Sequence, residues 1–242
     1  MIMKFAIRFF ILNLLFFKTI FSQNNLQERE FLIGQFEFSK HPDFINIKQI
    51  GIPVKRNDLF LQKEVAEQLL KLYQQLKKDL PNAEFWVTSA TRNYWHQKQI
   101  WENKWNQYQK QYKNDPQQIA TKILEYSSMP ATSRHHWGTD FDINILDNSY
   151  YERGNGKMIY EWLKKNAKKY GFCMPYNENR NTGYRLEKWH WSYYKLAKIY
   201  QQKWNESFQN NLFDSKIDFI GKEFFKTYAF IYVNAINPEC LE

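Results

Sequence analysis

Residues 133–142 are SRHHWGTDFD and residues 187–191 are EKWHW, and these two short stretches carry the strongest information on fold and chemistry. Together they supply the imidazoles of His135 and His190, aspartates in the first stretch, and Glu187 in the second. A catalytic zinc takes three protein ligands of this kind and keeps a fourth position for water. The two stretches therefore predict a hydrolytic zinc site.

The end of the first stretch has the period-two alternation of a strand. Polar and apolar side chains alternate over residues 139–146, with Asp140, Asp142 and Asn144 on one face and Phe141, Ile143 and Ile145 on the other. Residues two apart on a strand point to the same side. We therefore expect a half-buried strand that presents both aspartates to the site, and the spacing leaves open which of the two binds the metal.

Helices are expected on both sides of this strand, from apolar spacing, capping residues, and glycine or proline stops. They cover residues 57–78, 94–112, 115–126, 156–170, 192–208 and 216–235. Short β-rich runs are expected at residues 84–89 and 184–191. Helices at both ends of a strand-rich middle predict an α+β fold, with a small, largely antiparallel sheet that carries the zinc site.

The first 22 residues have the pattern of a secretory signal peptide. Lys4 and Arg8 precede an apolar run at residues 9–17, and Phe21-Ser22-Gln23 offers a cleavage point. That run is shorter than the roughly 20 apolar residues of a spanning helix. We therefore expect an exported protein of the periplasm or cell envelope, in which residues 23–242 form a single zinc peptidase domain.

The chain is basic, with a formal charge of +9. Loss of residues 1–22 would remove Lys4, Arg8, Lys18 and no acid, which lowers the charge by three to +6. The remaining lysines are spread along predicted helices as a solvated face, which disfavours a nucleic-acid-binding patch. We expect a monomer with no nucleic-acid partner and no stable membrane insertion after signal cleavage.

Cys173 and Cys240 are the only cysteines. Two thiols of an exported chain commonly pair in an oxidising compartment, so a disulfide that ties the C-terminal tail to the core is expected. The alternative is two separate buried thiols.

The pattern Ser133-x-His135-x-x-Gly138-x-x-x-Asp142, followed by Glu187-x-x-His190-Trp191, resembles the zinc signature of the D-Ala-D-Ala carboxypeptidase family. This is the group of vancomycin-resistance-type carboxypeptidases, in the superfamily that also holds lysostaphin and sonic hedgehog. The resemblance covers roughly residues 89–193. It implies one Zn²⁺ bound by His135, Asp142 and His190, with Glu187 as catalytic base.

The chain departs from this signature at Asp140, where family members usually have a small apolar residue. A carboxylate there would hydrogen-bond a ligand imidazole and orient it. Alternatively, Asp140 would replace Asp142 as the metal ligand.

A segment upstream, residues 89–97, resembles the family's Ser-Gly-Tyr-Arg-Ser-x-x-x-Gln segment but has Ala90 and Thr91 in place of the glycine and tyrosine. The resemblance implies that Arg92 stabilises the transition state, as its permanently charged guanidinium suits an oxyanion. Gln97 and Ser133 would help to hold the peptide terminus. Trp189 is a further candidate for lining the substrate pocket, although core packing is the commoner role of such aromatic residues.

These features predict an exported zinc metallopeptidase that removes the terminal D-Ala from peptidoglycan stem peptides. An L,D-carboxypeptidase or a cell-wall endopeptidase would use the same hydrolytic residues. A noncatalytic, zinc-bearing cell-wall-binding protein is the alternative from another class. A pure binder has no need of a base and an arginine beside an open metal position, so Glu187 and Arg92 favour an enzyme.

Overall fold

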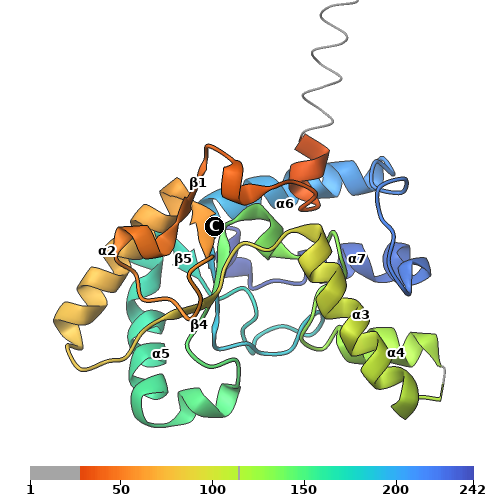
Figure 1. Ribbon diagram of the computed structural model, residues 1–242. Coiled ribbons are helices and arrows are strands. Elements are labelled where there is room, and N and C mark those ends of the chain that lie inside the picture. Colours follow the sequence, from red (N-terminus) through yellow and green to blue (C-terminus); the bar gives the residue numbers. More distant parts are fainter. Residues whose placement is uncertain (1–27, 114) are drawn as a thin grey trace, which may run out of the picture.

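The computed structural model describes residues 28–113 and 115–242 (Figure 1), so the predicted signal segment, residues 1–22, lies outside the described residues. A four-stranded antiparallel sheet has the order β3-β4-β6-β5, formed by Val87–Ser89, Asp140–Ile143, His190–Tyr193 and Phe172–Cys173. Strands β1 (Phe44–Asn46) and β2 (Phe60–Gln62) form a separate antiparallel pair.

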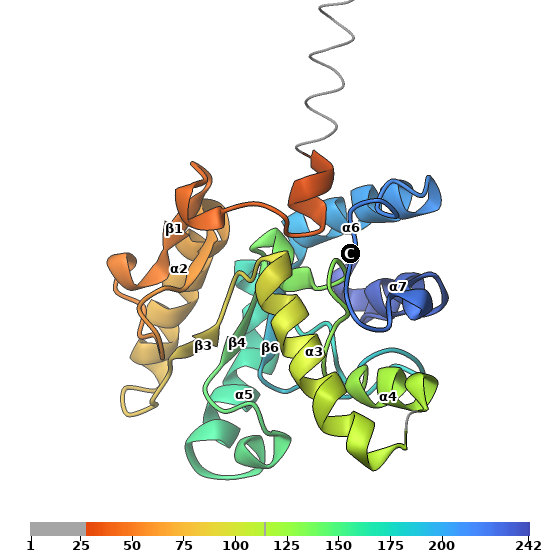
Figure 2. The same cartoon turned by 45° about the vertical axis from the view of Figure 1, so that its right-hand side comes forward.

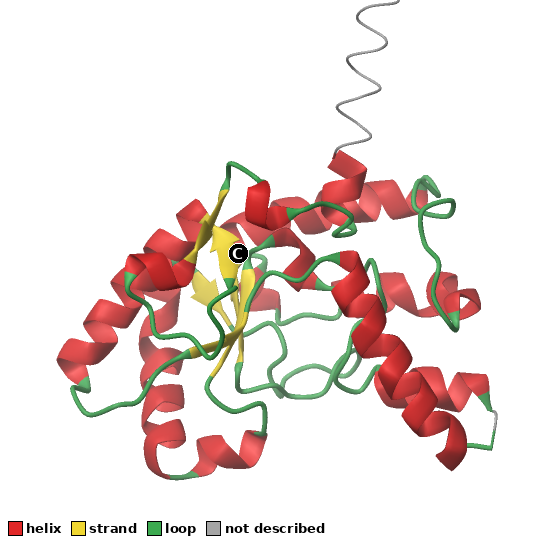
Figure 3. Cartoon of the chain, in the orientation of Figure 1, coloured by secondary structure: helices red, strands yellow, loops and turns green. Residues whose placement is uncertain are grey.

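Helices flank the sheet on both sides, as Figures 2 and 3 show. They are α2 (Lys63–Asp79), α3 (Tyr94–Gln111), α4 (Pro116–Ile123), α5 (Gly154–Asn166), α6 (Tyr194–Gln209) and α7 (Phe225–Asn234). Helices α2 and α5 lie on one side of the sheet, and α3 and α4 lie on the other (Figure 2). This arrangement confirms the predicted α+β fold. In the described part of the chain, no helix has the length and apolar character of a membrane span.

The alternation of the two central strands explains why the sheet has two different faces. Phe141 and Ile143 of β4 join Trp191 and Tyr193 of β6 in the hydrophobic core shared with α2 and α5. The other face of the same strands therefore carries Asp140, Asp142, His190 and Ser192. A second hydrophobic cluster, rich in tryptophan and built from α3, α4, α6 and α7, lies apart from the first.

Strand β4 differs from the expectation of a half-buried strand. All four of its residues are buried, since helices and loops cover the polar face as well. The sequence period correctly placed the aspartates on one face, and the expectation that the strand is only half-buried was wrong. Burial of both faces gives the aspartates a poorly solvated environment, which strengthens their electrostatic interactions.

Element boundaries differ most from the predicted ones at three places. Residues 60–62 pair with β1 as strand β2, so α2 begins only at Lys63. Residues 184–189 are not a strand, because the guanidinium of Arg180 binds the carbonyl groups of Tyr184 and Arg185 and holds them in a loop. The last helix begins at Phe225, since residues 216–221 form turns whose Ile220 carbonyl accepts a hydrogen bond from Trp101 Nε1.

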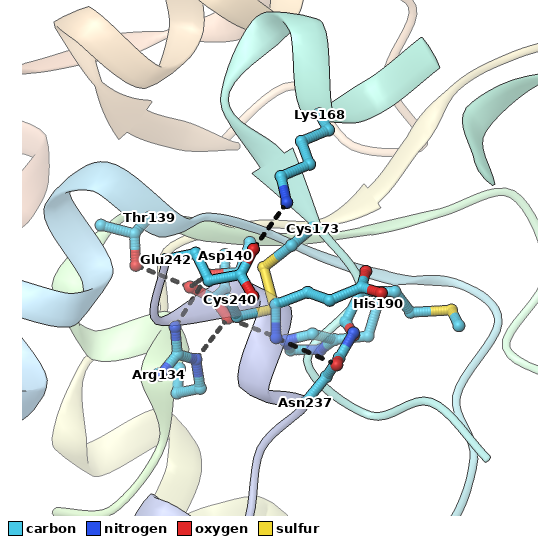
Figure 4. The surroundings of a disulfide bond; sticks show 12 residues. Arg134, Thr139, Asp140, Lys168, Cys173, His190, Asn237, Cys240 and Glu242 are labelled. Atoms are coloured by element: carbon cyan, nitrogen blue, oxygen red, sulfur yellow. Dashed lines mark hydrogen bonds and ion pairs between the residues drawn. A yellow bond between two sulfur atoms is a disulfide. The ribbon is translucent and has the colours of Figure 1, made fainter. Parts of the chain in front are cut away.

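The predicted disulfide between Cys173 and Cys240 is confirmed, with a Cα–Cα distance of 5.6 Å (Figure 4). It joins β5 to the short 3₁₀ helix Pro238–Cys240. Asn237 strengthens the junction, because its backbone amide donates to the Pro175 carbonyl at 2.8 Å. The C-terminal segment is thereby fastened beside the sheet.

Candidate metal centre and active site

A cleft of about 580 Å³ lies on the polar side of the sheet. Arg92, His135, Asp142, Glu187 and His190 all line it. These residues come from segments far apart in the sequence, and the sheet brings them together because β4 pairs with both β3 and β6. All the predicted metal and catalytic residues therefore share one cavity.

His135 lies in the 3₁₀ helix Arg134–Trp137 and is 2% exposed. Its Nδ1 is 2.8 Å from the Ala90 carbonyl oxygen. A carbonyl only accepts, so Nδ1 carries the proton and Nε2 keeps its lone pair. This Nε2 has no hydrogen-bond partner and lies 3.4 Å from Asp142 Oδ2. The free lone pair of His135 thus faces the aspartate.

His190, at the start of β6, directs the other ring nitrogen, Nε2, to a protein acceptor. Its Nε2 is 2.9 Å from Asp140 Oδ2, and its Nδ1 is 3.0 Å from Asp142 Oδ1. Burial lowers the pKa of His190, but the two carboxylates outweigh it and raise that pKa to about 9. With Nε2–H directed to Asp140, Nδ1 is the atom that His190 presents toward Asp142 and His135.

The donor atoms of His135, Asp142 and His190 all lie within 4.8 Å of one another. Burial would raise the pKa of Asp142, but His135 and His190 hold it well below its usual value, so the carboxylate is ionised. Two imidazole nitrogens and a carboxylate that converge on one open cavity fit the ligand set of a catalytic zinc. His135 Nε2 is left buried and unpaired by the protein, which also fits a metal ligand.

Asp140 lies on the same side of the sheet but is fully buried behind His190 (Figure 4). It accepts hydrogen bonds from Arg134 Nε at 2.9 Å, Thr139 Oγ1 at 2.6 Å and Ser192 Oγ at 2.8 Å. With His190 as a fourth donor, its oxygens are occupied by the protein. This geometry favours Asp142 as the metal ligand and Asp140 as the group that orients His190.

Glu187 is buried at the edge of the same cavity, with Oε2 3.7 Å from His190 Nδ1. A turn places it there, since the His190 amide donates to the Glu187 carbonyl at 3.2 Å. Burial raises the pKa of Glu187 to about 8, although the charge of His190 opposes it. A carboxyl group with a pKa near neutrality is suited both to accept and to return a proton.

Arg92 follows β3 and is held to the His135 segment by its backbone. Its amide donates to the His135 carbonyl at 3.1 Å, and its own carbonyl lies 2.8 Å from His136 Nδ1. Among the residues that the structure describes, the Nε of its side chain has no hydrogen-bond partner. The guanidinium is therefore available to a ligand in the cleft.

The three predicted substrate-binding residues occupy different positions relative to the cleft. Trp189 lines the cleft, with its ring 6.3 Å from that of Tyr126. Gln97 is buried and lines a small adjoining cavity, while its Nε2 donates to the Ser128 carbonyl. Ser133 is 1% exposed and lines neither cavity. The structure thus brings Trp189 and Gln97 to the walls of the two cavities, while Ser133 is buried two residues before His135 with its Oγ unpaired among the described residues.

Several residues that line this site were not predicted from the sequence, and Lys104 and Tyr176 are two of them. Lys104 of α3 lines the cleft, and Tyr176 packs its ring 4.6 Å from that of His190. Helical spacing from Gln97 would have found Lys104, because residues seven apart lie on nearly the same face of a helix. Tyr176 lies in a loop, where no periodicity indicates which way a side chain points.

Comparison with known proteins agrees with this geometry. The family model described as VanY, D-alanyl-D-alanine carboxypeptidase, matches residues 58–196, more than half of the chain. The protein named "Putative carboxypeptidase YodJ" of Bacillus subtilis (strain 168) is 30% identical over 148 residues, which cover 59% of this chain and 50% of that protein. A D-alanyl-D-alanine carboxypeptidase of Enterococcus faecium is 24% identical over 162 residues, or 65% and 44% of the two chains.

The chain spans about half the length of these two curated relatives. Among solved structures, that of the LdcB LD-carboxypeptidase aligns with a TM-score of 0.52 and 24% sequence identity. The alignment covers 73% of this chain and 80% of LdcB. At this identity the similarity to LdcB is one of fold.

Proposed function

The chain belongs to the VanY family of D-alanyl-D-alanine carboxypeptidases, and from this premise we propose that it is a zinc-dependent carboxypeptidase that removes the terminal D-Ala from peptidoglycan stem peptides. One observation carries the proposal. His135, Asp142 and His190 converge in an open cleft, with Glu187 and Arg92 beside them. Glu187 as a base and Arg92 as a cation without an ion pair among the described residues favour a hydrolase over a protein that only binds.

Zinc held by the three ligands would supply a Lewis acid that polarises the scissile carbonyl and activates a water. Glu187 takes a proton from the attacking water and passes it to the amine of the leaving D-Ala. Arg92 offsets the negative charge that develops on the carbonyl oxygen. Trp189 lines the cleft and limits the access of bulk water to the reacting bond.

We further propose that the protein is exported to the periplasm or cell envelope and acts as a monomer, with residues 23–242 as its zinc peptidase domain. The pattern of residues 1–22 supports export. An L,D-carboxypeptidase or an endopeptidase would use the same five residues, since the chemistry at the amide is the same.

The choice of substrate is tested by incubating the mature protein with pentapeptide-stem and tetrapeptide-stem muropeptides, with and without a chelator. The products are identified by mass spectrometry. Loss of one alanine from the pentapeptide, abolished by the chelator, is the expected result. Cleavage of the tetrapeptide alone would replace the proposal with an L,D-carboxypeptidase. If neither peptide is cleaved, the noncatalytic binding protein becomes the better account.

Replacement of Glu187 by glutamine is predicted to remove the proton acceptor and leave the metal ligands in place. We expect turnover of the pentapeptide to fall by a factor of roughly 10² to 10⁴. Zinc content, measured by atomic absorption, should stay at one per chain. Glu161→Gln is a matched control, because within residues 28–113 and 115–242 Glu161 forms its one ion pair with Lys164, on the surface. A near-normal rate for Glu187→Gln would refute the mechanism.

A further inference from the structure

Lys104 brings a second cation into the cleft from helix α3. Gln97, Ile100 and Lys104 follow one another at spacings of three and four residues, so they form one stripe along the helix. Ile100 and Lys104 line the main cleft, and Gln97 lines the adjoining cavity. Helix α3 thus directs Lys104 to the cavity that holds Arg92 and Glu187.

The ammonium group of Lys104 has no acidic partner among the described residues. Its Nζ donates to Ser127 Oγ at 2.7 Å and forms no ion pair there. By contrast, Lys98 on the same helix lies 3.7 Å from Glu102 and 3.9 Å from Asp218. An ammonium has three donors, so Lys104 retains donors for a ligand.

The local charges also favour an anionic ligand near Lys104. Burial lowers the pKa of Lys104, the charge of Glu187 raises it and that of Arg92 lowers it. A bound carboxylate would raise that pKa again, because it favours the charged ammonium. Since the Arg92 side chain also lacks an ion pair within the described residues, the cleft contains two cations that a substrate can use.

The substrate of a carboxypeptidase offers two negative charges to these two cations. One develops on the carbonyl oxygen during attack, and the other is the free carboxylate one residue beyond the scissile bond. Arg92 was assigned above to the first. Gln97 and Ser133 are both neutral, so they can donate hydrogen bonds to the second group but cannot neutralise its charge.

We propose that Lys104 binds the C-terminal carboxylate of the substrate and thereby makes the enzyme a carboxypeptidase instead of an endopeptidase. This inference rests on the proposed function and concerns the same site. An internal peptide bond has a neutral amide where the carboxypeptidase substrate has its carboxylate. With such a substrate Lys104 would stay partly desolvated and unpaired, which penalises binding.

The kinetic test compares a stem pentapeptide with the same peptide carrying a C-terminal amide. Lys104→Met should raise KM for the free acid by roughly 10- to 100-fold, the range expected for a lost charge-assisted hydrogen bond, with kcat nearly unchanged. The KM of the amide should stay unchanged or fall, because the penalty of an unpaired Lys104 is removed, so the preference for the acid should fall by at least the same factor. Lys104→Arg should restore part of it. Lys110→Met, an exposed lysine of the same helix, is the matched control.

An equal loss of kcat on both peptides, with unchanged KM, would overturn the inference, because Lys104 would then act through Glu187. Binding without turnover separates this outcome from failure of the proposed function. Zinc-loaded Glu187→Gln protein, with and without Lys104→Met, is titrated calorimetrically with D-Ala-D-Ala and with its amide. A preference for the acid that Lys104→Met removes supports Lys104 even if the wild type cleaves no peptide. Equal binding of acid and amide by the Lys104 protein refutes it.

Discussion

Asp140 and Asp142 are only two residues apart, yet their surroundings give them different tasks. Asp142 faces two imidazole nitrogens in an open cleft, whereas Asp140 is enclosed by four hydrogen-bond donors. His135 and His190 each direct one ring nitrogen to a protein acceptor and the other toward Asp142. The acceptor is the Ala90 carbonyl for His135 and the Asp140 carboxylate for His190. The orientation of both imidazoles is thus fixed by the protein itself.

At this scale, Asp140→Asn is predicted to weaken zinc binding without abolishing it. The amide keeps the shape of the side chain but loses the charge that orients His190, and loss of such a partner typically costs 10- to 100-fold in metal affinity. Competition with a chelator of known affinity measures the change, and a melting curve checks that the variant folds. Ser192→Ala, which removes one donor to Asp140, should have a smaller effect.

Asp142→Asn is the companion variant to Asp140→Asn. It should lose stoichiometric zinc, since Asp142 is assigned as a ligand. If Asp140→Asn loses its zinc completely while Asp142→Asn retains it, the two roles must be exchanged.

At the scale of elements, the register between β4 and β6 assembles the centre. Asp142 lies opposite His190, and Asp140 lies opposite Ser192. A shift of one residue would turn the carboxylates into the apolar core. His135 reaches the same place because the 3₁₀ helix Arg134–Trp137 ends at Gly138, whose φ of +69° turns the chain into β4. The short turn is therefore as important for the site as the strands.

Gly138→Ala is predicted to destabilise this turn. A Cβ atom would lie 2.4 Å from Phe44 Cε1, in addition to the strain of a positive φ. Overpacking of this kind typically costs about 1–3 kcal/mol. Gly51→Ala is the matched control, because Gly51 also has a positive φ but its Cβ would meet no atom within 4 Å. Urea unfolding should therefore show a larger loss for Gly138→Ala, and equal losses would contradict the packing argument.

On the scale of the whole molecule, the sheet separates a packed core from the functional side, and this division could be predicted in part. Period two placed Asp140 and Asp142 on one face, and motif spacing selected His135 and His190. Neither pattern contains information on distant partners, so the covering of both faces of β4 and the burial of Ser133 could not be predicted. Residues 184–189 form a loop and not the predicted strand. Their conformation depends on hydrogen bonds from Arg180, which no local period encodes.

The Cys173–Cys240 disulfide links two parts of the molecule that are 67 residues apart in sequence, and the segment between them contains Glu187, His190 and α6. Closing a loop of this length in the unfolded chain should stabilise the fold by about 4 kcal/mol in the chain-entropy model, within a usual range of about 2–5 kcal/mol. The double variant Cys173→Ser/Cys240→Ser should lose about that much free energy of unfolding in urea, followed by circular dichroism. Its zinc content should be retained, because the pairing of β4 with β6 and the hydrogen bonds to Asp140 and Ala90 hold His190 and His135 in place without the disulfide.

Reductant should lower the stability of the wild type to that of the double variant and leave the double variant unchanged. If the double variant folds with undiminished stability but loses its zinc, the disulfide supports the metal centre directly and not the global stability of the fold.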